Sequence, residues 1–339
     1  LQEAQAEFLN YKNTGMSIIE MSHRSPEYAA MHAETKALLR ELMEIPDDYE
    51  ILFIQGGGSL QFLMTAANFF TNKHAAYANT GVWAKKAMAE AKRFGEAYEA
   101  CTSAGKNHSY IPQELTIKPD TAYLHITANN TIYGTEWQDF PEVSVPVICD
   151  MSSDILSRPV DVKKFSLIYA GAQKNLGPAG VVIVIVKKAF LETARADLPP
   201  MLSYQNYTDN DSLYNTPPVF AIYMVNKTLH WIKAQGGVKA IAARNREKAQ
   251  LIYDVIDASR GFYRGHAEKA SRSLMNITFN LPTQELEKDF IAEGKKRGFI
   301  GIGGHRLVGG CRVSAYNAVT PEACRALADF MKEYQAKHE

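Results

Sequence analysis

The chain alternates between short apolar runs and longer segments in which apolar residues recur every three or four positions. Such runs predict buried strands, and the longer repeat predicts amphipathic helices. We predict strands at Ile51–Ile54, Ala76–Asn79, Ala122–Ile126, Val145–Cys149, Leu167–Tyr169 and Val181–Val186. We predict helices at Pro26–Glu44, Ser59–Phe70, Val82–Phe94, Val219–Gln235 and Val238–Ser259. This alternation is typical of an α/β fold whose sheet is mixed but mainly parallel.

The C-terminal part of the chain mixes strands and helices differently. We predict strands at Leu274–Phe279 and Gly310–Ser314, and helices at Gln284–Arg297 and Pro321–Tyr334. A chain of 339 residues exceeds the size at which one hydrophobic core usually stops growing. We therefore expect residues 1–240 to form a large domain and residues 241–339 a smaller α+β domain, joined by the long charged helix Val238–Ser259.

Charge and composition exclude several classes of protein. Lys+Arg and Asp+Glu both number 37, so no overall field favours nucleic acid or a membrane surface. The longest apolar run, Val181–Val186, is too short to cross a bilayer. No signal peptide is visible, and the chain opens on the amphipathic stretch Leu1–Tyr11, which we expect to be preceded by further residues. The spacing of the four cysteines fits neither a zinc site nor a disulfide framework: Cys101, Cys149, Cys311 and Cys324. We therefore predict reduced thiols in a cytoplasmic protein without a metal site.

A glycine-rich turn follows the first predicted strand, in ILFIQGGGSLQF (51–62). Unsatisfied backbone N–H groups at such a turn, and at the start of the next helix, bind anions. Neither GxGxxG nor GxxxxGK[ST] fits, because position 61 is glutamine. The turn is therefore a candidate phosphate site, with an ordinary strand–helix turn as the alternative.

An acid and a lysine lie at the ends of consecutive predicted strands. Asp150 ends one strand, where α/β sheets bind ligands, although Ser152, Ser153 and Asp154 suggest a helix cap instead. Lys174 follows the next strand, and desolvation there would lower its pKa and make its amine a nucleophile. A surface lysine is the alternative. Glycine-rich turn, acid and lysine, in this order, favour a Schiff-base site for pyridoxal phosphate.

Four more residues at predicted turns are candidates for cofactor contacts. Trp83 would stack on a flat ring or pack in the core at a helix start. Thr131 would bond a ring substituent or form a turn. Asn215 and Thr216 precede two prolines and would donate to a phosphate or cap the helix after Pro218.

Two separate His-Arg pairs carry the local positive charge. His23 and Arg24 lie near the start of the chain, and His305 and Arg306 precede Arg312 near its end. Arginine matches carboxylates and phosphates bidentately. The two pairs would converge on a doubly anionic substrate group, with Arg312 free for a carboxylate. Scattered solvated arginines are the alternative.

Five segments together resemble the class V aminotransferases, which are fold-type I pyridoxal phosphate enzymes. They are DMSSDILSRPVDVKKFSLIYAGAQKNLGPAG (150–180), SHRS (22–25), QGGGSLQF (55–62), SLYNTPP (212–218) and GHRLVGGCRVSAYNA (304–318). The likeness covers essentially the whole chain and is greatest to the members that act on phosphoserine. It implies a cytoplasmic homodimer with two active sites near the subunit interface and a large domain that binds the cofactor.

The resemblance also implies a role for each candidate residue. Lys174 would form the Schiff base, Asp150 would pair with the pyridine nitrogen, Trp83 would stack on the ring, and Thr131 would contact its hydroxyl side. Arg312 would take the substrate α-carboxylate. The cofactor phosphate would be held by Gly57, Gly58, Ser59 and Gln173, and by Asn215 and Thr216 of the partner subunit. The substrate's side-chain anion would be held by His23, Arg24, His305 and Arg306, some of them across the interface.

The implied reaction is reversible transamination of 3-phosphohydroxypyruvate with glutamate, giving phosphoserine and 2-oxoglutarate in serine biosynthesis. The resemblance also allows the phosphohydroxythreonine step of pyridoxine biosynthesis. The sequence departs from the family at Asn130, at Val313, in a glycine-rich turn without arginine, and in lacking a leading segment rich in Asn, Gly and Pro. The alternatives are a serine–glyoxylate aminotransferase, a cysteine desulfurase, or a truncated chain that binds the cofactor without activity.

Overall fold

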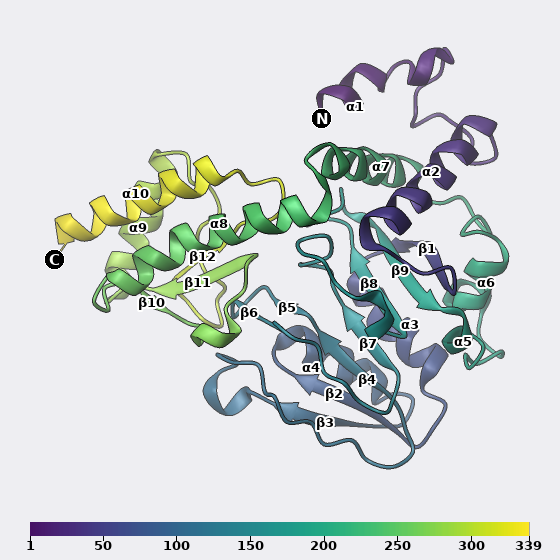
Figure 1. The fold of residues 1–339 in the computed structure, drawn as a ribbon, viewed down its shortest axis with the longest axis horizontal. Helices are drawn as coiled ribbons and strands as arrows, with labels where there is room; N and C mark the ends of the chain where they lie inside the picture. The colour runs from purple at the N-terminus through teal and green to yellow at the C-terminus, as the bar shows by residue number, and fades with distance from the viewer. Residues whose placement is uncertain (339) are drawn as a thin grey trace.

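The computed structural model describes residues 1–338, and its main feature is a seven-stranded sheet with helices on both faces (Figure 1). The strand order is β1-β9-β8-β7-β4-β2-β3. These strands are β1 (Tyr49–Gly56), β2 (His74–Asn79), β3 (Glu96–Thr102), β4 (Thr121–Thr127), β7 (Val147–Asp150), β8 (Leu167–Gly171) and β9 (Gly180–Lys187). The five strands from β8 to β3 run parallel, and β9 pairs antiparallel with both β1 and β8. The predicted α/β class with a mixed, mainly parallel sheet is confirmed.

Two layers of helices bury the faces of this sheet. The helices of this part are α1 (Gln2–Glu7), α2 (Pro26–Met43), α3 (Gly58–Phe69), α4 (Val82–Ala91), α5 (Lys188–Leu191), α6 (Tyr204–Asp209) and α7 (Val219–Ala234). Apolar side chains of α2 and α7 share one core with alternate residues of β1 and β9, and those of α3, α4 and α6 share a second core with the intervening residues. Because strand side chains alternate between faces, one apolar run supplies both cores.

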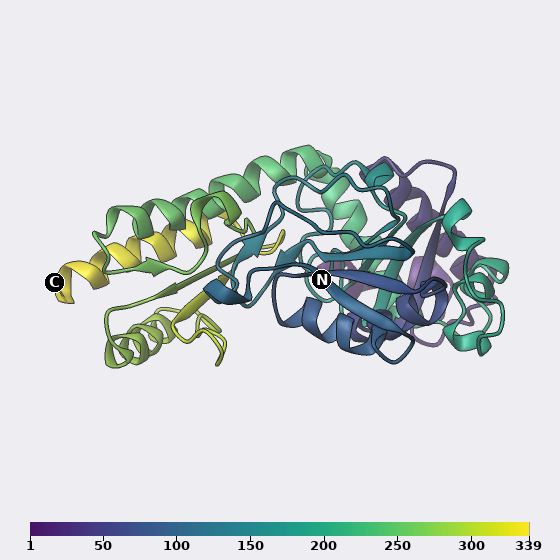
Figure 2. The same cartoon turned by 90° about the horizontal axis from the view of Figure 1, so that it is seen from below.

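A three-stranded antiparallel sheet forms a third core near the C-terminus. It comprises β10 (Arg264–Gly265), β11 (Asn276–Asn280) and β12 (Cys311–Ser314), and its helices are α8 (Gly237–Ala258), α9 (Gln284–Lys296) and α10 (Pro321–His338). Figure 2 shows α8 and α10 side by side on one face of this sheet, with α9 on the other. The long α8 runs from the end of α7 into this part of the chain.

The junction between α7 and α8 depends on two consecutive glycines. Gly236 and Gly237 have φ values of 94° and 76°, in the left-handed region that side chains with a Cβ avoid. The chain therefore bends between two long helices without a connecting loop. The predicted division at residue 240 falls just after this junction and stays a prediction.

The predicted elements all occur, with shifted ends that have local causes. The predicted strand Val145–Cys149 begins at Val147 because Pro146 has no N–H to donate. The predicted strand Leu274–Phe279 begins at Asn276, since the N–H of Leu274 is bonded to a Glu136 carboxylate oxygen. The edge strand β3 and the short pair β5 (Asn129–Asn130) and β6 (Thr135–Glu136) were not predicted. Among residues 1–338, no helix is both long and apolar enough to span a bilayer.

Candidate active site

Asp150 and Lys174 lie at the carboxyl ends of the adjacent parallel strands β7 and β8. Asp150 is the last residue of β7 and pairs in register with Tyr169 of β8, and Lys174 lies three residues beyond the end of β8. Asp150 Oδ1 accepts a 2.9 Å hydrogen bond from the N–H of Ser152. No helix follows Asp150, so the helix-cap interpretation of this segment is wrong. Asp150 and Lys174 therefore lie at the same edge of the sheet, as their positions at strand ends predicted.

Burial changes the pKa of both groups. It raises the pKa of the Asp150 carboxyl, and the bond from Ser152 and the charge of Lys174 oppose that rise. Burial lowers the pKa of the Lys174 amine, opposed by Asp150 and Asp154 and assisted by Arg312. A lysine with a lowered pKa supplies the unprotonated amine that attacks carbonyl carbon. The pair is therefore suited to nucleophilic and proton-transfer chemistry.

The glycine-rich turn lies against the segment that follows Asp150. A Cβ on Gly58 would lie 3.2 Å from Ser152 Oγ, and that hydroxyl accepts a 3.0 Å hydrogen bond from the N–H of Gly171. The helix α3 begins at Gly58 with Gly57 as its N-cap, and no side chain caps it. Its first amides are thus available to an anion. Ser59 is exposed, and the Gln173 side chain lies over Gly171.

Trp83, Thr131 and Arg312 form a chain of contacts across three parts of the molecule. The indole Nε1 of Trp83, the second residue of α4, donates to Thr131 Oγ1 over 3.1 Å. Arg312 on β12 donates from Nη1 to the carbonyl oxygen of Thr131, also over 3.1 Å. Arg312 Nε is buried and has no hydrogen-bond partner among the described residues. The structure therefore brings these three predicted residues together and leaves one arginine donor free.

The loop with His305 and Arg306 is held by tightly packed glycines. A Cβ on Gly304 would lie 1.9 Å from the carbonyl oxygen of Gly309, which only glycine avoids. Burial, Arg312, Arg306 and Lys86 together lower the pKa of His305. Arg312, Arg306 and Lys86 therefore all lie within electrostatic range of His305, and Lys86 was not predicted. Its position three residues after Trp83, on the same face of α4, is the signal that would have identified it.

The structure does not bring the other predicted residues to Lys174 within one chain. Asn215 donates to Gln55 Oε1 over 2.8 Å, directly before the glycine-rich turn, and Thr216 is exposed. Neither caps α7, whose N-cap is Pro218 without a side-chain bond, so the capping alternative is wrong. His23 is 7% exposed with Nε2 unpartnered, and Arg24 is exposed.

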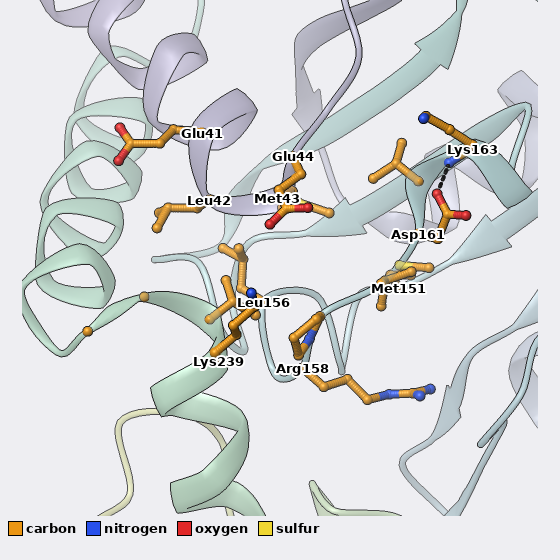
Figure 3. Close-up of a pocket in the computed structure, with 16 residues that line it drawn as sticks. Glu41, Leu42, Met43, Glu44, Met151, Leu156, Arg158, Asp161, Lys163 and Lys239 are labelled. Carbon is orange, nitrogen blue, oxygen red and sulfur yellow. Dashed lines mark hydrogen bonds between the residues drawn. The ribbon is translucent and has the colours of Figure 1, made fainter.

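A surface pocket of about 510 Å³ lies elsewhere, between α2, the segment after β7 and the α7–α8 junction (Figure 3). Its labelled residues include Glu44, Met151, Arg158 and Lys239. None of the predicted site residues lines it. The site is therefore defined by the convergence of Lys174, Asp150 and the arginines and not by the depth of a cavity.

A buried group of charges lies behind Asp150. Asp154 is 1% exposed, and neither of its carboxylate oxygens has a hydrogen-bond partner among residues 1–338. Arg158 Nε lies 3.0 Å from Glu136 Oε1, and Glu136 is fully buried. Burial, and secondarily the charge of Glu136, raise the pKa of Asp154 to about 8. Burial thus favours the protonated, neutral form of Asp154 in the folded protein.

We expect Asp154→Asn to flatten the pH dependence of stability in the cofactor-free protein. Folding raises the pKa of this carboxyl from 3.8 to about 8, so the folded chain holds a proton that the unfolded chain releases in this range. Stability is therefore lost as pH rises from 3.8 towards 8, by up to about 1.4 kcal/mol per pH unit. Guanidinium denaturation at several pH values between about 5 and 8.5 would measure this slope.

The control for this variant is Asp139→Asn, which makes the same substitution at an exposed position. It should leave the slope of the wild type unchanged. If the stability of Asp154→Asn falls with pH as steeply as that of the wild type, Asp154 does not hold the proton.

Comparisons with known proteins agree with this geometry. Residues 1–327 match the family described as aminotransferase class-V. Because the match covers far more than half of the chain, the protein belongs to the class V aminotransferases. The chain is 55% identical to phosphoserine aminotransferase of Bacillus subtilis (strain 168), over 100% of this chain and 95% of that relative. The resemblance stated from the sequence is confirmed.

Solved structures give the same result. Phosphoserine aminotransferase from Bacillus circulans subsp. alkalophilus superposes with a TM-score of 0.97 at 51% identity, covering 100% of this chain and 95% of that one. The pyridoxal-phosphate-bound phosphoserine aminotransferase from Trichomonas vaginalis superposes with a TM-score of 0.93 at 37% identity, covering 98% and 95%. The fold is therefore that of the phosphoserine aminotransferases.

Proposed function

We propose that this enzyme catalyses the reversible transamination of 3-phosphohydroxypyruvate with L-glutamate, which gives O-phospho-L-serine and 2-oxoglutarate. The observation that carries the proposal is the convergence of Lys174 and Asp150, at neighbouring strand ends, with Arg312 from the C-terminal sheet. Relatives at 50–55% identity carry the name phosphoserine aminotransferase over the whole chain. The activity belongs to serine biosynthesis, and the phosphohydroxythreonine of pyridoxine biosynthesis, which also joins an amino-acid group to a phosphate, is a second candidate substrate.

The donor set of the site fits pyridoxal 5′-phosphate. It offers a lysine amine with a lowered pKa, a buried carboxylate, an indole, and a helix start without a side-chain cap. Asp150 would hold the pyridine nitrogen, Trp83 would cover the ring and Thr131 would bond its hydroxyl side. The cofactor phosphate would lie among Gly57, Gly58, Ser59, Gln173, Asn215 and Thr216. When bound, the cofactor supplies an electron-withdrawing ring for the electron pair left at the substrate Cα.

Each protein group then has one task. With the cofactor bound, Lys174 would act as the base that removes the proton from the substrate Cα, and as the acid that returns a proton to that carbon in the reverse direction. Asp150 would be kept ionised by the positive charge of a bound pyridine nitrogen and would in turn hold that nitrogen protonated, because an adjacent positive charge lowers a carboxyl pKa. Arg312 binds the α-carboxylate in both half-reactions. His305 and Arg306, with His23 and Arg24, bind the side-chain phosphate or carboxylate.

The proposed assembly is a homodimer in the cytoplasm. Five apolar side chains on the N-terminal segment and α7 are exposed in the single chain and would be covered by a second copy: Phe8, Leu9, Met16, Ile19 and Phe220. Asn215 and Thr216 would reach the partner's cofactor, and His23 and Arg24 would act across the same interface. Residues 1–240 and 241–339 would act as cofactor-binding and C-terminal domains, which the separate third core supports.

A comparison of amino donors tests the proposal. We expect kcat/KM for phosphoserine to exceed that for serine by about 10²-fold, because one charge-assisted hydrogen bond contributes about 1.5–3 kcal/mol. Purified enzyme loaded with pyridoxal phosphate would be assayed with each donor and 2-oxoglutarate. Equal values for the two donors would contradict the phosphate-binding roles and favour the serine–glyoxylate alternative.

The cysteine desulfurase alternative finds no support in the structure. Such an enzyme needs a cysteine on a mobile loop of its active site. Cys311 is fully buried on β12, paired in register with Phe279, and burial raises its thiol pKa to about 12. The predicted strand position of Cys311 is confirmed, and its thiol is unsuited to nucleophilic attack at neutral pH.

A further inference from the structure

Four basic side chains from distant parts of the sequence lie close enough to interact electrostatically, since Lys86, Arg306 and Arg312 all lower the pKa of His305. They are Lys86, His305, Arg306 and Arg312, and we call them the cation cluster. The Nζ of Lys86 lies 4.8 Å from the centroid of the Trp83 ring. Trp83 is joined to Arg312 through Thr131 by two hydrogen bonds of 3.1 Å. Lys86 on α4 and Arg312 on β12 therefore belong to one site, although 226 positions separate them in the sequence (312 − 86).

No acid neutralises the cation cluster within the described part of the chain. None of its four members forms an ion pair with a carboxylate among residues 1–338, and Arg312 Nε is buried without a partner. Positive charges gathered without counter-charges raise the local concentration of anions. A partly buried guanidinium donor without a partner also favours a ligand that accepts its hydrogen bond.

The four members of the cation cluster differ in charge, and therefore in the substrate group that each can bind. His305 Nδ1 accepts a 3.3 Å hydrogen bond from the N–H of Leu307, so its proton lies on Nε2. Burial and the neighbouring cations hold the pKa of His305 below its usual value, and the ring is neutral at pH 7. With Arg312 on the α-carboxylate, Lys86 and Arg306 remain as the two full charges of one chain for the substrate side chain.

The two substrates of the proposed reaction differ in side-chain charge. A phosphate monoester carries about −1.5 to −2 at pH 7, whereas the side-chain carboxylate of glutamate carries a single negative charge. One arginine suffices for the carboxylate. The phosphate gains from a further cation besides Arg306 and the proposed Arg24, and Lys86 is exposed and free of carboxylate partners among the described residues.

We propose that Lys86 is a specificity-determining residue whose ammonium binds the second negative charge of the substrate phosphate. This inference rests on the proposed function. It assigns Lys86 a role in binding the phosphorylated substrate, with little part in binding glutamate or 2-oxoglutarate. The point charge of lysine suits this task, since its long side chain reaches the phosphate without fixing its orientation.

Kinetics of Lys86→Gln in the holoenzyme test the proposal. We expect KM for phosphoserine to rise about fivefold to tenfold, with KM for glutamate and kcat for both donors changed by less than about twofold. Lys86→Arg should restore most of the affinity for phosphoserine. Lys85→Gln, which removes an equal charge one position earlier, should behave like the wild type.

Chemical labelling gives a second measurement that does not depend on turnover. Inorganic phosphate should slow the acetylation of Lys86 in the wild-type holoenzyme, and Lys85 in the same peptide map should react at an unchanged rate. Phosphate that protects neither lysine, or KM values that rise equally for both donors, would overturn the assignment of Lys86. A wild-type enzyme that protects Lys86 but does not turn over phosphoserine would instead refute the proposed function.

Discussion

Lys174→Ala should abolish transamination, with kcat reduced at least about 10³-fold. General acid–base catalysis by one positioned group contributes about 10²–10⁴-fold, and Lys174 is also the proposed attachment point of the cofactor. The Lys174 side chain is half-buried next to Asp150, and burial lowers the pKa of its amine. We expect no exposed lysine to take over this role. Turnover of phosphoserine and 2-oxoglutarate by loaded wild type and variant would measure the effect.

Two further variants separate charge from proton transfer. Lys174→Arg keeps the positive charge but cannot be deprotonated near neutral pH, and it should be as inactive as Lys174→Ala. Lys164→Ala removes an exposed lysine just before β8 and should keep wild-type activity. Borohydride reduction of the loaded wild type, followed by peptide mapping, should find the cofactor on Lys174. An adduct on a different lysine would remove Lys174 from its proposed role.

Arg158→Met should lower the free energy of unfolding by about 3–5 kcal/mol, as expected when a buried charge loses its partner. Arg158 Nε lies 3.0 Å from the carboxylate of Glu136, and the two side chains are 15% and 0% exposed. The guanidinium also donates to the carbonyl oxygens of Trp137 and Gln138. Glu136 in turn accepts a 2.7 Å hydrogen bond from the N–H of Leu274. Loss of Arg158 would thus weaken the contact between the large sheet and the segment before β11.

The pH dependence of the lost stability, and a comparison with an exposed ion pair, identify the cause of the loss in Arg158→Met. Burial already raises the pKa of Glu136 and Arg158 opposes it, so Arg158→Met should raise that pKa further. The loss of stability should therefore shrink at low pH, where Glu136 is protonated in both folded and unfolded chains. Arg93→Met breaks an exposed 2.9 Å pair with Glu90 and should cost less than about 1 kcal/mol.

Guanidinium denaturation of the cofactor-free proteins would give these values. Adding Glu136→Gln to Arg158→Met should recover part of the loss, because the amide leaves no buried charge and still accepts from Leu274. A double variant as unstable as Arg158→Met alone would assign the loss to the contacts with Trp137 and Gln138.

The elements of the large sheet were predictable because each buried strand is an apolar run and each helix has an apolar stripe. β9 is the plainest case, with six consecutive fully buried residues from Val181 to Val186. β3 was missed because Glu96 and Glu99 interrupt its apolar pattern. It lies at the edge of the sheet, where only alternate residues need burial.

Part of the candidate site was also predictable from the sequence. Asp150 and Lys174 follow consecutive strands, and the carboxyl ends of parallel strands meet at one edge, so their proximity required no other information. Lys86 was missed although it lies three residues after Trp83 on the same helix, a spacing that places both on one face of α4. Asp154 and Glu136 were missed because a carboxyl gives no sign of its burial in local sequence.

The sequence by itself determined the α/β class, the order of the chemical groups and, through long motifs, the family. These depend on local periodicity and on residue types at strand ends, which neighbouring residues specify. Only the tertiary structure decided which polar groups meet: Trp83 of α4 with Thr131 and, through it, Arg312 of β12, and Glu136 with Arg158 in the interior. Such pairs join segments far apart in the chain, and their energies depend on burial, which arises only when the helices and sheets pack.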